Sequence, residues 1–170
     1  MKIRLSSYKE SWKSLYQNEC KNLEGILGDL IIQFEHFGST SIEGMKAKPV
    51  IDMMVIVRDI QKVDQFNSLF INLGYEVAGE WGISGRRLLR KGGENRTHHI
   101  HIYEQGNKEI ERHIIFRDYL RVNEKVAQEY SHYKEMLASK YHDTREYSKA
   151  KKDYVRNVEK EALMWFDNLK

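Results

Sequence analysis

The segment that most restricts the fold is VIDMMVIV at residues 50–57, an apolar run interrupted by one charged residue, Asp52. The run is rich in β-branched residues, and Pro49 disfavours helix in the residue before it. Such a run is typical of a central strand covered on both faces, so we expect a sheet with helices packed against it. Because an unpaired buried charge is very costly, the Asp52 carboxylate must be solvated, paired or bound to a metal.

Apolar periodicity predicts the other elements. Residues 8–27 and 60–72 place apolar side chains three, four or seven apart and are followed by glycines, which predicts amphipathic helices. Residues 31–37 alternate as a strand does. Glycines punctuate the middle of the chain, where we expect an antiparallel meander of three strands at 75–79, 85–92 and 96–104. The predicted C-terminal helices are 107–122, 123–141 and 144–168.

This order of elements predicts an α+β fold: a mixed sheet packed by helices, with a helical C-terminal tail. The length suits one hydrophobic core, and no linker composition interrupts the chain, so we expect a single domain over residues 1–170.

Charge and cysteine content narrow the class of protein. The formal net charge is only +3, so no global basic field points to nucleic acid as the main partner. The single cysteine, Cys20, excludes an internal disulfide framework. No segment has the apolar length of a signal peptide or of a membrane span. We therefore expect a cytoplasmic protein that does not act in a membrane.

A polar turn directly follows the predicted strand 31–37, and its residues are Gly38, Ser39, Thr40 and Ser41. Glycine permits a tight turn in which successive backbone N–H groups point at an anion, and Lys48 adds positive charge nearby. The turn is not a P-loop, because GxxxxGK[ST] is absent. It predicts either a phosphate-binding turn or an ordinary strand-ending turn with hydroxyl hydrogen bonds.

Asp52 and a histidine-rich strand are the candidate catalytic or metal-binding groups. A carboxylate just inside a buried strand, after a phosphate turn, is suited to hold Mg²⁺, and the alternative is a salt bridge to Lys48 or an arginine. In THHIHIY, strand alternation puts His99 and His101 on one face, where two imidazoles can bind one transition metal, hold a phosphate or supply a general base. If their strand lies beside that of Asp52, the three side chains can bind a transition metal, so Zn²⁺, Mn²⁺ or Fe²⁺ would compete with Mg²⁺.

Most of the many cationic residues are expected to be solvated or in surface pairs, which contribute little individually. A few can converge on a triphosphate. The candidates come from three places: Arg86 on the middle strand of the meander, Arg117 in the segment HIIFRDYLR, and Lys151 in the last helix.

The segments HFGSTSIEGMKAKPVID, RTHHIHIYE, HIIFRDYLR and YSKAKKDYV occur in this order, and through them the sequence closely resembles the GrpB family of bacterial proteins. The resemblance covers nearly the whole chain, from the region of Trp12 to that of Tyr154. That family is similar to the nucleotidyltransferase superfamily, whose members carry a Gly-Ser turn and, on the next strand, an Asp-x-Asp or Asp-x-Glu pair. The resemblance therefore implies a nucleotidyltransferase-like sheet.

The resemblance also implies roles for single residues. Gly38 and Ser39 match the turn that cradles the phosphates of a nucleotide, and Asp52 matches the first metal-binding carboxylate. The second carboxylate belongs at position 54, where this chain has Met54, and a thioether is a poor Mg²⁺ ligand. Either one of the strand histidines completes a changed metal site, or nucleotidyl transfer has been lost and the pocket only binds.

Three functions follow as hypotheses. The first is a metal-dependent nucleotidyltransferase that binds a nucleotide or another phosphorylated small molecule, with Mg²⁺ or Mn²⁺ on Asp52 and the cationic candidates around the phosphates. The second is a non-catalytic module that binds a nucleotide or phosphate. The third is a metal-dependent hydrolase with Asp52, His99 and His101 as its metal ligands.

Overall fold

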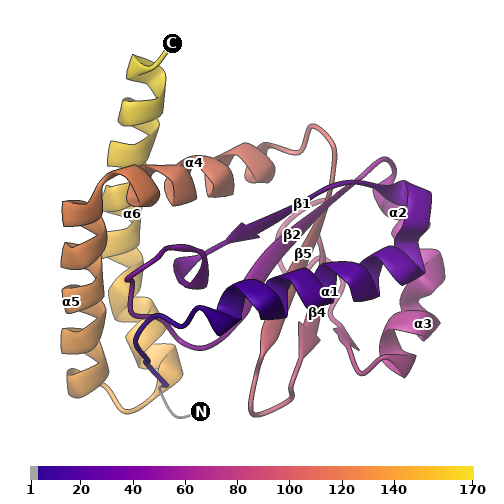
Figure 1. The fold of residues 1–170 in the computed structure, drawn as a ribbon, viewed down its shortest axis with the longest axis horizontal. Helices are drawn as coiled ribbons and strands as arrows, with labels where there is room; N and C mark the ends of the chain where they lie inside the picture. Colours follow the sequence, from indigo (N-terminus) through magenta and orange to yellow (C-terminus); the bar gives the residue numbers. More distant parts are fainter. Residues whose placement is uncertain (1–3) are drawn as a thin grey trace.

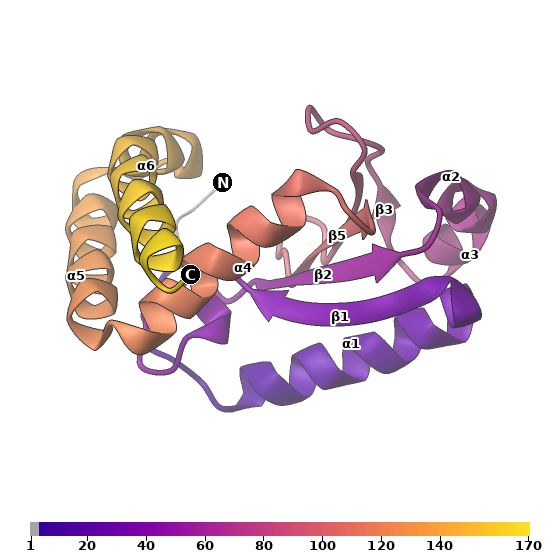
Figure 2. The ribbon, with the colours of Figure 1, turned by 90° about the horizontal axis from the view of Figure 1, so that it is seen from above.

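Five strands form one mixed sheet within residues 4–170, the part of the chain that this computed structural model describes. The strands are β1 (Ile31–Phe37), β2 (Ile51–Val57), β3 (Glu76–Val77), β4 (Arg87–Lys91) and β5 (His98–Glu104). Their order in the sheet is β1-β2-β5-β4-β3. Figure 1 labels β1, β2, β5 and β4, and Figure 2 labels β3. β2 pairs antiparallel with β1 and parallel with β5, whereas β5, β4 and β3 are antiparallel in succession. The predicted antiparallel meander is therefore confirmed.

Helices cover both faces of the sheet. They are α1 (Ser11–Leu27), α2 (Ile60–Val63), α3 (Asn67–Asn72), α4 (Lys108–Val122), α5 (Glu124–Lys140) and α6 (Thr144–Asn168). Figure 2 shows α1 on one face of the sheet and α4 on the other, with α5 and α6 near the end where β1 finishes and β2 begins. The α+β architecture with a helical C-terminal tail is confirmed. Among the helices of residues 4–170, none combines the length and the apolar character that crossing a bilayer requires.

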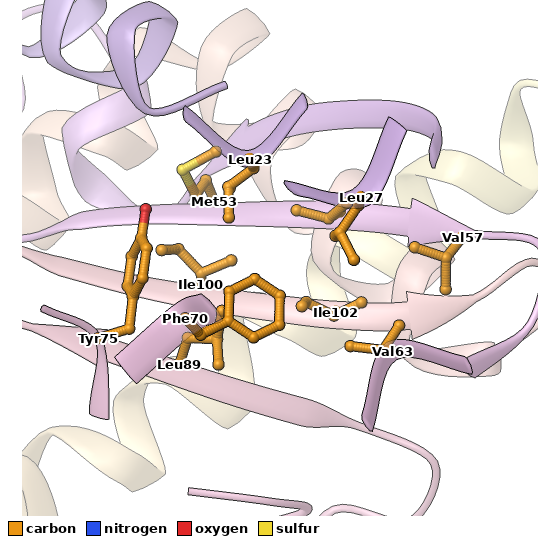
Figure 3. Packing of buried hydrophobic residues seen from close by; sticks show 11 residues of the cluster. Leu23, Leu27, Met53, Val57, Val63, Phe70, Tyr75, Leu89, Ile100 and Ile102 are labelled. Carbon is orange, nitrogen blue, oxygen red and sulfur yellow. The ribbon is translucent and has the colours of Figure 1, made fainter. Parts of the chain in front are cut away.

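β2 is buried on both faces, as its sequence predicts. Met53 is fully buried on the side of α1, in one cluster with Leu23 of α1 and Ile100 of β5 (Figure 3). Met54 is fully buried on the opposite side, in a cluster with Ile56. Burial of a side chain of this size contributes about 1.5–3 kcal/mol. A slip of one residue would exchange the two faces, so this packing fixes the register of β2 and the position of its polar residue.

The loop between β1 and β2 is held by the C-terminal helices. Ile42 and Met45 of this loop are buried in a cluster with Leu120 of α4, Tyr130 of α5 and Val158 of α6. Because the loop and three helices share this cluster, α5 and α6 lie close to the residues that precede β2.

Two predicted elements differ from the structure. The helix expected over 60–72 is two short helices separated by a 3₁₀ turn at Asp64–Phe66, where the Asp64 carboxylate pairs with Arg87 of β4 at 2.7 Å. The strand expected over 75–79 has only two strand residues, although both neighbours that follow β3 still hydrogen-bond to Leu88. Neither difference changes the order of the sheet.

Candidate functional site

Asp52 lies one residue inside β2 and faces both histidines that the sequence places on one side of β5. The two strands pair in parallel, with Asp52 opposite His99 and Met54 opposite His101. Asp52 Oδ1 is 3.6 Å from His99 Nδ1 and 3.4 Å from His101 Nε2. Burial alone would raise the pKa of the Asp52 carboxyl, but interactions with His101 and His99 hold that pKa well below its usual value. The three side chains therefore form one cluster with an ionised carboxylate at its centre.

A hydrogen-bond chain fixes the proton of His101. Nη1 of Arg86, a side chain that only donates, lies 3.3 Å from His101 Nδ1. Nδ1 therefore accepts, which leaves the proton on Nε2, from where it is donated to Asp52 Oδ1. Burial lowers the pKa of His101, in keeping with a neutral ring. In this arrangement neither ring nitrogen of His101 keeps a lone pair for a metal ion.

The loop after β1 approaches Asp52 closely because Gly38 carries no side chain. Gly38 has φ +73° and ψ −177°, a conformation that is essentially restricted to glycine. A Cβ on this residue would lie 2.8 Å from Asp52 Oδ2. The 3₁₀ turn that follows is closed by the Ser41 hydroxyl, which donates to the Gly38 carbonyl at 2.6 Å. The predicted turn and the predicted carboxylate are thus neighbours, while the Ser41 hydroxyl is used within the turn.

A cavity of about 200 Å³ lies beside Asp52 and this turn. The predicted site residues that line it are Ser39, Thr40, Lys48, Asp52, His99 and Lys151. Two polar lining residues, Lys134 of α5 and Tyr147 of α6, are not identified in the sequence analysis, and the remaining lining residues are the apolar Ala47 and Val50. The structure therefore brings most of the predicted site together and adds one cation and one phenol.

Three lysines reach the cavity from separate segments of the chain. Lys134 is only 2% exposed, and its Nζ donates to Ser39 Oγ at 2.8 Å. Nζ of Lys48 and Nζ of Lys151 lie 4.9 and 5.4 Å from the centre of the Tyr147 ring. In the part of the chain that the structure describes, none of the three forms an ion pair with an aspartate or a glutamate. The alternative salt bridge between Lys48 and Asp52 is therefore not formed.

Burial lowers the pKa of each of these lysines, and for Lys134 and Lys48 the charge of neighbouring lysines lowers it further. Burial, followed by the charges of Lys151 and Lys48, lowers the pKa of Lys134 to about 7. Burial and Lys151 lower the pKa of Lys48 to about 8, although Asp52 partly opposes this shift. Burial also lowers the pKa of Lys151. The cavity therefore holds more positive charge than its single carboxylate compensates, and an anionic ligand would relieve that imbalance.

The donor set does not fit the divalent metal that the sequence suggests. Two-metal phosphoryl transfer needs several acidic ligands, and position 54 supplies only a methionine buried in the core. Within residues 4–170, no three His, Cys, Asp or Glu side chains are arranged to hold a metal ion. The expected Mg²⁺, Mn²⁺ or Zn²⁺ on Asp52, His99 and His101 thus finds no support in this geometry, nor does the hydrolase that would depend on it.

The two arginines predicted to bind phosphate lie outside the cavity lining, as do Gly38 and Ser41 of the turn. Arg86 is buried and donates to two loop carbonyls as well as to His101. Arg117 pairs through Nη1 with Glu35 at 2.6 Å and through Nε with Asp118 at 2.9 Å. The expectation that Arg117 surrounds the phosphates is not met, because two carboxylates already neutralise its charge.

Replacement of Arg117 by methionine is therefore expected to affect stability and not ligand affinity. The change leaves Glu35 without its cationic partner and should lower the free energy of unfolding by about 1–3 kcal/mol. Urea denaturation measures this loss, and calorimetry with ATP under native conditions measures the affinity. A large loss of affinity in a folded Arg117→Met protein would show that this arginine does bind the ligand.

A larger cavity of about 590 Å³ lies elsewhere, between the loop before β2 and the junction of α4 with α5. Its charged lining residues balance, since Lys13 and Arg121 face Glu43 and Glu124. Size alone would favour it as a ligand site. The smaller cavity carries the unbalanced charge and the perturbed lysines, so we assign the candidate site there.

Comparisons with known proteins agree on one family. The family model described as GrpB protein matches residues 2–161. The glutamate-rich protein GrpB of Alkalihalophilus pseudofirmus is 35% identical over 162 residues, which cover 92% of this chain and 93% of that protein. The YqkA protein of Bacillus subtilis is 44% identical over 96% of this chain, but the chain spans only about half of that protein, 48%.

One solved structure leads to the same family. The crystal structure of the conserved protein GrpB from Enterococcus faecalis is matched with a TM-score of 0.91 and 43% identity, over 95% of this chain and 98% of that one. A structure of Cid1 in complex with the UTP analog UMPNPP is matched with a TM-score of 0.48 and 14% identity, over 74% of this chain and 39% of that one. The resemblance drawn from the sequence motifs is confirmed, and this chain belongs to the GrpB protein family.

Proposed function

We propose that this protein binds the phosphate groups of a nucleotide or another phosphorylated small molecule in the lysine-lined cavity. The observation that carries the proposal is the convergence of Lys48, Lys134 and Lys151 on a space that holds one carboxylate, Asp52. Buried charges are costly unless they are paired, and phosphate oxygens would pair with all three ammonium groups. Tyr147 adds a buried hydroxyl that has no hydrogen-bond partner among the described residues.

The size of the cavity indicates which part of the ligand it holds. Whole drug-sized ligands occupy about 300–1,000 Å³, and this cavity has about 200 Å³. It therefore suits the phosphate end of a molecule whose remainder extends outward past His99, a partly exposed side chain. The similarity of the GrpB family to nucleotidyltransferases makes a nucleotide the first ligand to test.

A thermal-shift screen tests the proposal. Nucleotides and phosphorylated cofactors are each compared with the same compound lacking its phosphates, so that the phosphates are the only difference. We expect a rise in Tm with the phosphorylated member of at least one pair and none with its partner. Equal shifts within every pair, or no shift at all, would contradict phosphate recognition.

Nucleotidyl transfer is a second candidate function, and the position of His99 favours it. Its Nδ1 faces the ionised Asp52 carboxylate, an arrangement that orients an imidazole as a general base and stabilises it after it gains a proton. In such a transfer an acceptor hydroxyl would attack the α-phosphorus, the bond to pyrophosphate would break, and His99 would receive the hydroxyl proton. The lysines would hold the departing pyrophosphate.

Label transfer tests this second function. The protein is incubated with α-labelled nucleoside triphosphates and cell extract, and label is sought on an acceptor. His99→Gln should abolish transfer and leave nucleotide affinity largely unchanged. Transfer that survives both His99→Gln and Asp52→Asn would show that neither residue serves the reaction.

Affinity for a phosphorylated ligand is expected to fall as the pH rises above about 7. Burial and the neighbouring lysines lower the pKa of free Lys134 to about 7, whereas a bound phosphate raises it. Above that pKa the ammonium must take up a proton before it can pair, so each such lysine weakens binding by up to about tenfold per pH unit. Lys48 titrates in the same range and adds to the slope, while Asp52 stays ionised throughout.

Calorimetry of ATP binding at pH values on both sides of 7 measures this slope. The Lys134→Met protein is the control and should show a shallower dependence. An affinity that is flat or rises with pH would contradict the assigned role of the lysines.

A further inference from the structure

We propose that the three lysines take the place of divalent metal ions at this site, so that the protein binds its phosphorylated ligand without a metal. This inference rests on the proposed function and specifies its chemistry. In many phosphoryl-transfer sites Mg²⁺ neutralises the phosphate oxygens, with several carboxylates holding the ion. This cavity has the opposite distribution of charge, because three ammonium groups and only one carboxylate line it.

The lysines are placed firmly enough to act as fixed cations. Lys134 is almost fully buried, is tied to Ser39 Oγ at 2.8 Å and lies over the Tyr130 ring with its Nζ 4.5 Å from the ring centre. Lys48 and Lys151 both lie against the fully buried ring of Tyr147. Fixed donors of this kind lose little freedom when a phosphate arrives, so they can replace an ion that would otherwise organise the ligand.

Two positions that a metal site would need here supply no ligand. His101 is bonded on both ring nitrogens, to Arg86 and to Asp52. Met54 fills the core at the position of a second carboxylate. A divalent cation at Asp52 would also face the positive charges of the lysines at close range, whereas a metal-free phosphate would be attracted by them.

The charge balance specifies the class of ligand. Three protonated lysines and Asp52 leave two positive charges in the cavity, which suits a diphosphate or triphosphate group more than a singly charged anion. Bound Mg²⁺ removes two negative charges from ATP and occupies phosphate oxygens that the lysines would contact. Free ATP and free pyrophosphate are therefore the matched ligands.

Calorimetric titration of ATP and of pyrophosphate, once with EDTA and once with excess Mg²⁺, tests the inference. We expect binding of both in EDTA and about tenfold weaker binding in Mg²⁺. Binding that requires Mg²⁺ would overturn this inference and leave the proposed function standing. No binding under either condition would overturn both.

Two variants and a metal titration sharpen the result. In EDTA, Lys134→Met should weaken ATP binding by about tenfold or more, because it removes a charge-assisted contact. Lys46→Met is the matched control, since Lys46 pairs with Glu135 and does not line the cavity. Mn²⁺ added alone and followed by electron paramagnetic resonance should remain free. Stoichiometric Mn²⁺ binding that Asp52→Asn abolishes would overturn the inference.

Discussion

Replacement of Gly38 by alanine is expected to abolish binding of phosphorylated ligands and to lower the free energy of unfolding by about 2–4 kcal/mol. An alanine at φ +73° is strained, and its Cβ would lie 2.8 Å from Asp52 Oδ2. Relief of that contact requires either the turn or the carboxylate to move. Because Ser39 belongs to the turn and is bonded to Lys134, movement of the turn also displaces a lysine from the cavity.

The matched control is Gly44→Ala. Gly44 has a similar φ of +79°, but a Cβ there would meet nothing within 4 Å. Its loss of stability should reflect backbone strain alone, about 1 kcal/mol, with ligand affinity retained. Urea denaturation and ATP calorimetry on both proteins give the comparison. Equal effects of the two substitutions would show that contact with Asp52 does not explain the need for glycine at position 38.

Replacement of Lys134 by methionine is expected to stabilise the free protein while weakening ligand binding by about 10- to 100-fold. A lysine that is 2% exposed and lacks a carboxylate partner opposes folding when it is charged, and methionine fills similar space without a charge. We expect an increase of about 1 kcal/mol in the free energy of unfolding, which corresponds to roughly 2–4 °C in Tm. Opposite changes in stability and affinity are the signature of a residue retained for binding.

The pH dependence of this stabilisation has a definite sign. The pKa of Lys134 is lowered in the folded state. Below about pH 7 the lysine is therefore charged in both the folded and the unfolded protein, and burial of its charge then lowers the free energy of unfolding by the full amount. As the pH rises from 7 towards the ordinary pKa of lysine, the folded protein binds fewer protons than the unfolded one, and this reduction in the free energy of unfolding declines. The gain from Lys134→Met should therefore be largest below pH 7.

Lys140→Met serves as the control on the same helix. Lys140 is exposed near the end of α5, so its replacement should change neither stability nor affinity appreciably. If Lys134→Met behaved like Lys140→Met in both measurements, Lys134 would have no special role.

Much of the fold could be predicted because local pattern and core packing agree. The C-terminal helices were predicted within a residue or two of α4, α5 and α6, since glycine and polar caps mark their ends. Alternation predicts β1, the continuous β-branched run predicts β2, and intervening glycines predict the strands of the meander. The break at Asp64–Phe66 could not be predicted, because it accompanies an ion pair with a strand distant in the sequence.

Strand alternation also predicts which polar side chains of the site share a face of the sheet. It placed His99 and His101 on one face, and the observed parallel pairing of β2 with β5 brings both to Asp52. The sequence could not decide that these strands are neighbours. It also could not show that Arg86 occupies the second nitrogen of His101, which weakens the case for a metal.

Lys134 is the main site residue that the sequence analysis does not identify, although one feature of the sequence points to it. It lies four residues after Tyr130 and three before Leu137, on the stripe of α5 that the sequence predicts to face inward. A lysine on the apolar face of a helix indicates a ligand site. Its hydrogen-bond partner, Ser39, is 95 positions away in the sequence, so the sequence does not reveal the pair. Arg117 is the opposite case. It is assigned to the ligand in the sequence analysis, and the structure shows that its charge pairs with two carboxylates.

The most direct test is the pKa of Lys134 itself, measured by NMR of ¹³C-labelled lysine side chains with and without saturating pyrophosphate in EDTA. Lys134→Met assigns the resonance. We predict a pKa near 7 in the free protein, raised by at least about one unit when pyrophosphate binds. An ordinary lysine pKa that pyrophosphate leaves unchanged would contradict a buried cation that receives phosphate.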